Sequence, residues 1–110
     1  MSDERTTVAA LRQIVREFVA QRQWEPFHTP KNLAMSLAIE AAELMEHFQW
    51  LTVEESHAVR EQPEKLSEVA DELADVLCYA LAMANALDID VATAVREKMQ
   101  KNARKYPPPG

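Results

Sequence analysis

The first 109 residues contain no glycine, and this absence constrains the fold of the 110-residue chain more than any other feature. Alanine, leucine, glutamate and glutamine, which favour helices, are abundant, whereas the runs of valine, isoleucine and threonine that are typical of strands are few. The chain is therefore predicted to be all-α. Its length suits one domain, so residues 1–110 are expected to form a single domain with a small core.

Apolar periodicity and capping residues predict a helix bundle of four main helices and one short helix. The first helix runs from about Thr7 to Arg22 and carries one apolar stripe: Val8, Leu11, Ile14, Val15, Phe18 and Val19. A loop rich in aromatic residues follows. Thr29 and Pro30 then suit the N-cap and the first position of the second helix.

The second helix is predicted to end at Trp50 and Leu51. Directly after it, Thr52 and Glu55 have the spacing of a capping box, in which each side chain binds the backbone N–H of the other residue. The box predicts the start of the short helix, which continues to about Glu61.

The third main helix is predicted over residues 63–87 and the fourth over about 91–104, with Asp90 as the N-cap of the fourth. Every residue from 76 to 84 is apolar except for the hydroxyl group of Tyr79. A helix that is apolar on all sides is buried on all sides. A chain of this size can enclose few such helices, so we expect the third helix to lie at an interface with a second subunit.

The net charge of −6 argues against a nucleic-acid backbone as a partner. Cys78 is the only cysteine; it is expected to be a small buried residue, and the lack of a second cysteine favours a reducing compartment. The N-terminus lacks the apolar segment of a signal peptide, and the longest uncharged stretch, residues 76–87, is too short to span a bilayer. We therefore expect a cytoplasmic protein without a membrane partner.

Two acidic pairs lie within these apolar helix patterns: Glu40 with Glu43, and Glu72 with Asp75. Residues three apart are neighbours on one helix face. A carboxylate on an apolar face is destabilising unless a positive charge meets it, and no lysine or arginine lies between positions 31 and 60 or between 65 and 96. Because hard oxygen ligands suit Mg²⁺ or Mn²⁺, the pairs predict a divalent metal site, which with four acids could hold more than one ion.

Spacing alone does not choose between the Glu72 pair and a second pair, Glu68 with Asp71, because all four positions share one helical stripe. The Glu72 pair lies nearer the apolar run and is preferred for that reason. A solvated acidic helix face is the alternative interpretation. A carboxylate-bridged di-iron centre is disfavoured, because His47 does not stand three residues after an acid and the third helix has no histidine.

Four further tracts extend well beyond the acidic pairs. W-E-x-F-H-x-P-x-N-L is matched by Trp24, Glu25, Phe27, His28, Pro30, Asn32 and Leu33. E-L-x-E-x-F-Q-W is matched by residues 43–50, E-L-x-D-V-L-x-Y by residues 72–79, and K-M-x-x-N-x-x-x-Y-P by residues 98–107. In these tracts nearly the whole chain resembles the all-α MazG-type nucleoside triphosphate pyrophosphohydrolases, and within them the dCTP pyrophosphatase branch. The resemblance selects Glu72 and Asp75 as the second acidic pair.

The resemblance implies Mg²⁺-dependent hydrolysis of a nucleoside triphosphate at the α-phosphorus by a tetramer built from dimers. Glu40, Glu43, Glu72 and Asp75 would bind the metal; Trp24, Phe27, His28, Trp50 and Tyr79 would line the nucleotide pocket; Lys98 and Asn102 would meet the phosphates. Glu43 is the candidate to orient or deprotonate the attacking water. The resemblance implies dCTP or a related dNTP as the substrate. The vertebrate dCTP enzymes carry a nucleotide-contacting histidine where this chain has Val15, so the exact base stays open.

A second functional class would show the same acidic pattern. A catalytically silent helical module could use its acids to bind a basic partner, with Trp24 and Trp50 as packing residues and Lys98 and Asn102 on a solvated face. Metal-dependent release of pyrophosphate distinguishes the two classes.

Overall fold

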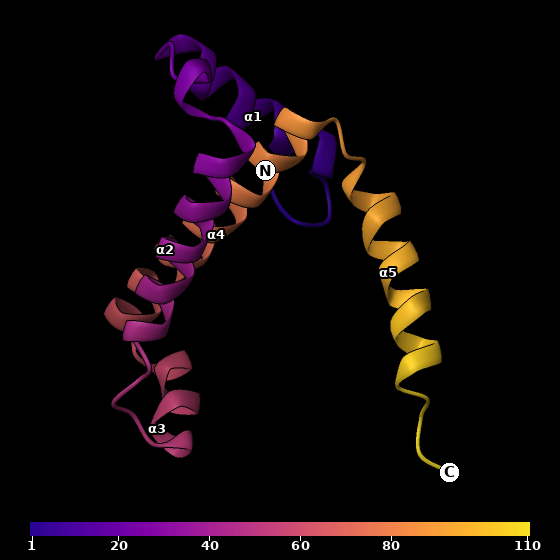
Figure 1. The fold of residues 1–110 in the computed structure, drawn as a ribbon. Coiled ribbons are helices and arrows are strands. Elements are labelled where there is room, and N and C mark those ends of the chain that lie inside the picture. Colours follow the sequence, from indigo (N-terminus) through magenta and orange to yellow (C-terminus); the bar gives the residue numbers. More distant parts are fainter.

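The computed structural model describes residues 1–110 and contains helices but no strands, which confirms the all-α prediction (Figure 1). The helices are α1 (Val8–Gln21), α2 (Pro30–Glu46), α3 (Val53–Ala58), α4 (Pro63–Leu87) and α5 (Val91–Lys105), with 3₁₀ turns at Glu25–Phe27 and Val59–Glu61. These are the four long helices and the short one that the periodicity predicts.

The predicted N-caps Thr29, Thr52 and Asp90 are present, and Thr7, which was expected to be the first residue of the first helix, is the N-cap of that helix. The side chains of Thr7, Thr29 and Asp90 each accept a hydrogen bond from a backbone N–H three residues later, at the starts of α1, α2 and α5. Thr52 and Glu55 form the full capping box of α3. Short polar side chains therefore define where four of the five helices begin, as their sequence positions indicate.

Helix α2 ends at Glu46, before the predicted end at Trp50 and Leu51. The backbone tightens at this point, because the N–H groups of His47 and Phe48 bind carbonyl oxygens three residues back, at 3.2 and 2.9 Å. Apolar side chains continue past the last helical turn, so the apolar pattern alone did not show that the helix ends at Glu46. Trp50 consequently lies in a turn rather than on the helix.

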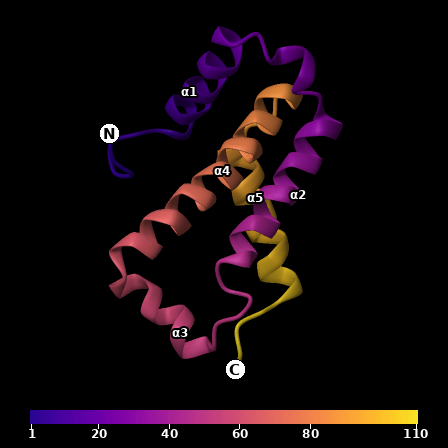
Figure 2. The same cartoon turned by 90° about the vertical axis from the view of Figure 1, so that its left-hand side faces the viewer.

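Helix α4 is the centre of the packed part of the molecule. Helices α1 and α2 both lie alongside it (Figures 1 and 2). The buried side chains come from all of these elements and from the turn before α4: Val19, Leu33, Val59, Ala82 and Ala84. The core is small, and its position makes α4 the scaffold on which residues of α1 and α2 are placed.

A network of hydrogen bonds fixes α1 against the end of α4. The guanidinium groups of Arg12 and Arg16 each donate to the side-chain oxygen of Asn85 at 3.0 Å, and the Asn85 amide donates to the backbone carbonyl of Arg12 at 3.1 Å. Arg12 also donates to the backbone carbonyls of Ala84 and Ile89, at 3.1 and 2.7 Å. We refer to Arg12, Arg16 and Asn85 as the arginine–asparagine network.

The single chain leaves much of α4 uncovered. Leu77 is 54% exposed, and Cys78 is exposed as well, so the prediction of a buried Cys78 is wrong for the single chain. Helix α5 stands apart from the other helices (Figure 1). The chain exposes 8823 Å² of surface, whereas a compact protein of this mass exposes about 6,200 Å². Its radius of gyration is 16.6 Å, against about 13 Å for a compact domain of this length.

No single helix has both the length and the apolar character needed to cross a membrane. Helices α4 and α5 meet these criteria only when taken together, and a bend of 104° separates them.

Candidate functional site

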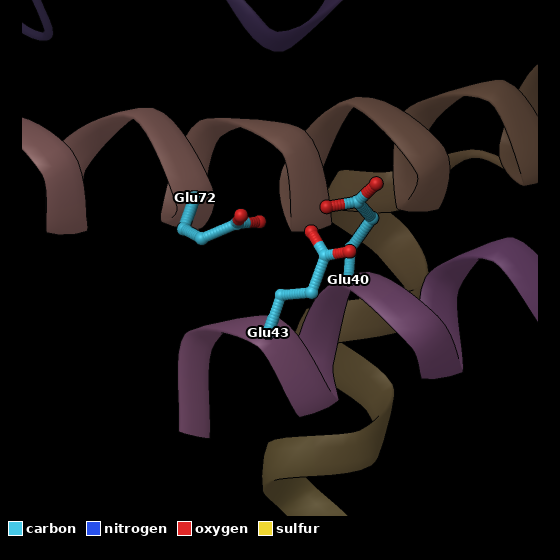
Figure 3. Close-up of side chains that lie close together, drawn as sticks. All are labelled: Glu40, Glu43 and Glu72. Atoms are coloured by element: carbon cyan, nitrogen blue, oxygen red, sulfur yellow. The ribbon is translucent and has the colours of Figure 1, made fainter. Parts of the chain in front are cut away.

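Three carboxylates converge between α2 and α4. Glu40 and Glu43 extend from neighbouring turns of α2, and Glu72 extends toward them from α4 (Figure 3). One oxygen from each side chain lies within 4.8 Å of the other two. We call Glu40, Glu43 and Glu72 the acidic cluster. Helical spacing explains why Glu40 and Glu43 are neighbours on α2. The packing of α2 against α4 then brings Glu72 close to both of them.

No positive side chain meets the acidic cluster. The only ion pair in the molecule joins Lys65 to Glu68 at 4.0 Å, and Lys65 also makes a 2.9 Å hydrogen bond with His47. One oxygen of Glu40 and one of Glu72 are buried without any hydrogen-bond partner. Buried polar atoms in folded proteins are almost always partnered, so these two oxygens indicate that a ligand belongs here.

Hydrogen bonding between the carboxylates, their burial and their mutual repulsion change the acidity of the cluster. The pKa of Glu40 is raised from 4.5 to about 7, first by its interaction with Glu72, then by burial, and then by Glu43. Interaction with Glu40 lowers the pKa of Glu72, but burial and the carboxylates of Glu43 and Asp75 raise it by more. At neutral pH the cluster therefore keeps part of a proton that an ordinary glutamate has lost, and a bound cation would displace that proton.

The donor set fits a hard divalent cation. Clustered carboxylate oxygens are the ligands that Mg²⁺ and Mn²⁺ prefer, and there is no cysteine or histidine among them. Glu72, and not Glu68, is one of the clustered acids. Asp75 is exposed and is not one of the three clustered acids; it lies one turn further along α4, at the wall of the adjacent pocket.

A largely apolar pocket of about 380 Å³ lies next to the cluster, between α1, α4 and the loop before α2. It is lined by Ile14, Val15, Phe18, Val19, Trp24, His28, Asp75, Cys78, Tyr79 and Ala82, and we call it the aromatic pocket. The ring centroids of Trp24 and His28 are 6.2 Å apart, and those of His28 and Tyr79 are 6.4 Å apart. Flat rings line one wall, and Asp75 connects this pocket to the side of α4 that carries Glu72.

Three of the five residues expected in a nucleotide pocket, Trp24, His28 and Tyr79, line the aromatic pocket. The other two do not: Phe27 is 68% exposed, and Trp50 is 87% exposed in the turn after α2. Lys98 and Asn102 lie on α5, which makes no hydrogen bond or ion pair with α2 or α4.

Several residues of the pocket wall were not predicted from the sequence. Ile14, Phe18 and Val19 belong to the apolar stripe of α1, which the sequence assigns to the core. In the fold, part of that stripe faces the pocket instead. Cys78 also lines the pocket, where partial burial and the Asp75 carboxylate raise the pKa of its thiol and keep it protonated.

A sequence profile of the MazG-like family matches residues 35–109, which include the acidic cluster and all of α4 and α5. The chain belongs to the MazG-like family. This membership confirms the resemblance drawn from the sequence tracts and accounts for the all-α fold.

The chain is also similar to proteins that are named as pyrophosphatases. The chain is 41% identical over 101 residues to dCTP pyrophosphatase 1 of Homo sapiens and 40% identical over 101 residues to that of Rattus norvegicus. Each match covers 92% of this chain and 59% of the relative, so the chain spans about three-fifths of the length of these relatives. The crystal structure of a pyrophosphatase from Archaeoglobus fulgidus superimposes with a TM-score of 0.85 at 43% identity, covering 98% of this chain and 99% of that one.

Proposed function

We propose that this MazG-like protein hydrolyses (deoxy)nucleoside triphosphates, with dCTP or a related dNTP as substrate, to a nucleoside monophosphate and pyrophosphate. One observation carries the proposal: buried carboxylate oxygens without partners lie beside a pocket lined with aromatic rings. A nucleotide with its metal ion has both parts that such a site needs, because its phosphates are charged and its base is flat. The relatives named as pyrophosphatases support the same activity.

Glu40, Glu43 and Glu72 are proposed to hold Mg²⁺, with Mn²⁺ as a substitute, and Asp75 to complete the set of ligands from the next turn of α4. When bound, the metal would neutralise phosphate charge and lower the pKa of water. Glu43 is proposed to orient or deprotonate the water that attacks the α-phosphorus. Glu43 lies on the same face of α2 as Glu40, so its carboxylate lies beside the other metal ligands without a change of backbone.

The aromatic pocket is proposed to bind the base and the sugar. Trp24 and His28 offer ring faces for stacking, which contributes about 1–3 kcal/mol per base. The ring of Tyr79 lies one turn beyond Asp75, where it would pack under the sugar and exclude a 2′-hydroxyl group. Val15 gives the pocket an aliphatic wall, so the base is selected here by shape and stacking more than by hydrogen bonds.

Phe27, Trp50, Lys98 and Asn102 are proposed to contribute once the protein is assembled. All four are on parts of the chain with high exposure or few contacts. The surplus of exposed surface supports a homo-oligomer, and we propose a tetramer built from dimers that acts in the cytoplasm in nucleotide-pool control or sanitation.

Pyrophosphate release from a panel of the four dNTPs and four NTPs, with and without Mg²⁺, tests the proposal. We expect Mg²⁺-dependent release that is fastest with dCTP or a close relative. If no nucleotide in the panel releases pyrophosphate, the protein is an acidic interaction module instead, and the proposal is wrong.

The role of Tyr79 predicts faster turnover of dCTP than of CTP. Replacing Tyr79 with alanine opens the space under the sugar, so we expect the ratio of kcat/KM for dCTP over CTP to fall toward one. An unchanged ratio in Tyr79→Ala would show that another residue excludes the ribose.

A further inference from the structure

The chain turns sharply after α1, and we call Arg22, Gln23 and Trp24 the tryptophan turn. Gln23 has a left-handed backbone with φ 57° and is one of two non-glycine residues with a positive φ. Its N–H donates to the carbonyl of Ala20 at 3.1 Å, and the next N–H, that of Trp24, donates to the carbonyl of Val19 at 3.0 Å. These two hydrogen bonds form a Schellman motif, which ends a helix with a single left-handed residue.

The Schellman motif places Trp24 against Phe18 of α1. In such motifs the residue after the left-handed one commonly makes an apolar contact with the last turns of the helix. Here the two rings meet edge to face, with centroids 5.6 Å apart and an angle of 71° between their planes. Both rings line the aromatic pocket. The backbone of the tryptophan turn therefore sets the position of one wall of that pocket.

Gln23 makes this arrangement costly. Glycine is the usual residue at the left-handed position of a Schellman motif, because it has no Cβ to clash with the backbone. Glutamine at this position stores strain, and strained residues are commonly retained where they hold functional groups in place. The strain lies directly before Trp24 in the chain, and therefore next to the pocket.

Arg22 holds the second ring of the pair. Its guanidinium carbon lies 3.5 Å from the centroid of the Phe18 ring, and its Nη1 donates to the backbone carbonyl of Phe18 at 3.2 Å. A cation over an aromatic face is attracted by the electrons of the ring. Arg22 forms no ion pair with an acidic side chain. The Phe18 ring is thus in contact with a cation over its face and with the ring of Trp24.

The protein core does not hold these rings, because Phe18 is 46% exposed and Trp24 is 43% exposed. We propose that Arg22 is a positioning residue of the aromatic pocket, which fixes Phe18 and through it Trp24 before any ligand binds. The inference rests on the proposed function, in which Trp24 stacks on the base. Arg22 itself does not line the pocket. Its effect on a nucleotide is to remove the entropy cost of ordering the rings on binding.

The fluorescence of Trp24 tests the positioning without any substrate. In a Trp50→Phe background Trp24 is the only tryptophan of the chain. We expect Arg22→Ala to raise the constant for quenching by acrylamide about twofold and to speed the decay of fluorescence anisotropy, because the fixing cation–π contact is lost. Arg22→Lys should restore both values, since an ammonium group can also lie over the ring. Arg60→Ala, which removes an arginine without an ion pair far along the chain, is the matched control.

Alanine favours helices, so Arg22→Ala should keep the helix content of the wild type in circular dichroism. An equally quenched and equally immobile Trp24 in Arg22→Ala would overturn the proposal. An effect of equal size in Arg60→Ala would also overturn it, because the change would then be a general loss of stability.

Steady-state kinetics with dCTP and Mg²⁺ test the consequence for binding. Arg22→Ala should raise KM about two- to fivefold, which is equivalent to the roughly 0.5–1 kcal/mol of an exposed cation–π contact. The value of kcat should stay unchanged, because stacking binds substrate and transition state alike. A lower kcat at an unchanged KM would contradict a positioning role.

A double substitution separates the contact with Phe18 from the favourable effect of any cation at the end of a helix. In a Phe18→Leu background, Arg22→Ala should raise KM no further, because the ring through which Arg22 acts is absent. A full additional increase would overturn the proposed route through Phe18. If the wild type hydrolyses no nucleotide, the proposed function fails, while the fluorescence of Trp24 still decides whether Arg22 fixes the rings.

Discussion

Two polar groups of residues lie along α4, and their hydrogen bonding is opposite. Near the end of the helix, the side-chain oxygen of Asn85 accepts from both Arg12 and Arg16, and its amide donates to a backbone carbonyl. Near the middle, Glu72 faces Glu40 and Glu43, and two buried oxygens have no partner at all. The same helix thus carries one fully satisfied group and one unsatisfied group.

The difference in hydrogen bonding indicates that the Asn85 group stabilises the fold and that the Glu72 group binds a ligand. A satisfied polar network stabilises the fold and orients α1 and α5, whereas an unsatisfied one destabilises the metal-free protein and is retained for what it binds. Substitution should therefore have opposite effects at the two places: loss of stability at Asn85, and loss of ligand binding with gained stability at Glu72.

The largest expected effect is the loss of activity in Glu72→Gln. The substitution keeps the shape of the side chain and removes one charge that the metal needs, so kcat should fall by at least about 100-fold, given the several kcal/mol of charge stabilisation that a bound metal supplies. The metal-free variant should at the same time resist urea better than the wild type, because one repelling charge is gone.

Glu68→Gln is the matched control for that substitution. It makes the same chemical change one turn away, on an exposed residue whose only ion-pair partner is Lys65. Turnover and Mg²⁺ affinity should stay near the wild-type values. If Glu68→Gln were as damaging as Glu72→Gln, the assignment of the acidic cluster would be wrong.

The next effect in size is on stability, in Asn85→Ala. The substitution removes three hydrogen bonds, two of them from charged guanidinium groups. The free energy of unfolding, measured by urea titration, should fall by about 2–3 kcal/mol. Gln13→Ala, which removes two exposed hydrogen bonds, one with Arg16 and one with Glu17, should cost much less. Mg²⁺ affinity should not change in either variant, because neither touches the acidic cluster.

The smallest expected effect is the dependence on pH. Because the folded protein holds the pKa of Glu40 near 7 instead of 4.5, it keeps a proton that the unfolded chain releases. The metal-free protein should therefore lose stability as pH rises from 4.5 to 7. Mg²⁺ binding must displace this proton, so its affinity should rise about tenfold between pH 6 and pH 8. Calorimetric titration at both values measures the change, and Glu40→Gln should weaken the pH dependence of stability without abolishing it, because the pKa of Glu72 is also raised.

Helix boundaries and the acidic pairs were predictable from the sequence because they depend on neighbours in the chain. Thr7, Thr29 and Asp90 cap their helices locally, and Glu40 and Glu43 share a face through helical spacing alone. The predicted end of α2 was wrong because apolar residues continue through the tight turn at His47.

Features that depend on packing between distant segments were not predictable in the same way. Nothing in the spacing shows that Arg12 reaches Asn85, or that Ile14 and Phe18 line a cavity rather than the core. The expectation of an interface on the third helix does follow from the sequence, since a run that is apolar on all sides cannot be covered by one short chain. The exposed Leu77 agrees with that reasoning, and the partner surface stays a prediction.

The central claim is that the acidic cluster is a divalent metal site, and a titration with Mn²⁺ followed by electron paramagnetic resonance tests it most directly. Free Mn²⁺ gives a strong signal that disappears on binding, so the readout needs no substrate and no turnover. We expect the wild type at pH 8 to remove at least one equivalent of the signal per chain, Glu68→Gln to do the same, and Glu72→Gln to leave the signal nearly intact. Equal binding by the wild type and Glu72→Gln, or no binding by either, would contradict the account.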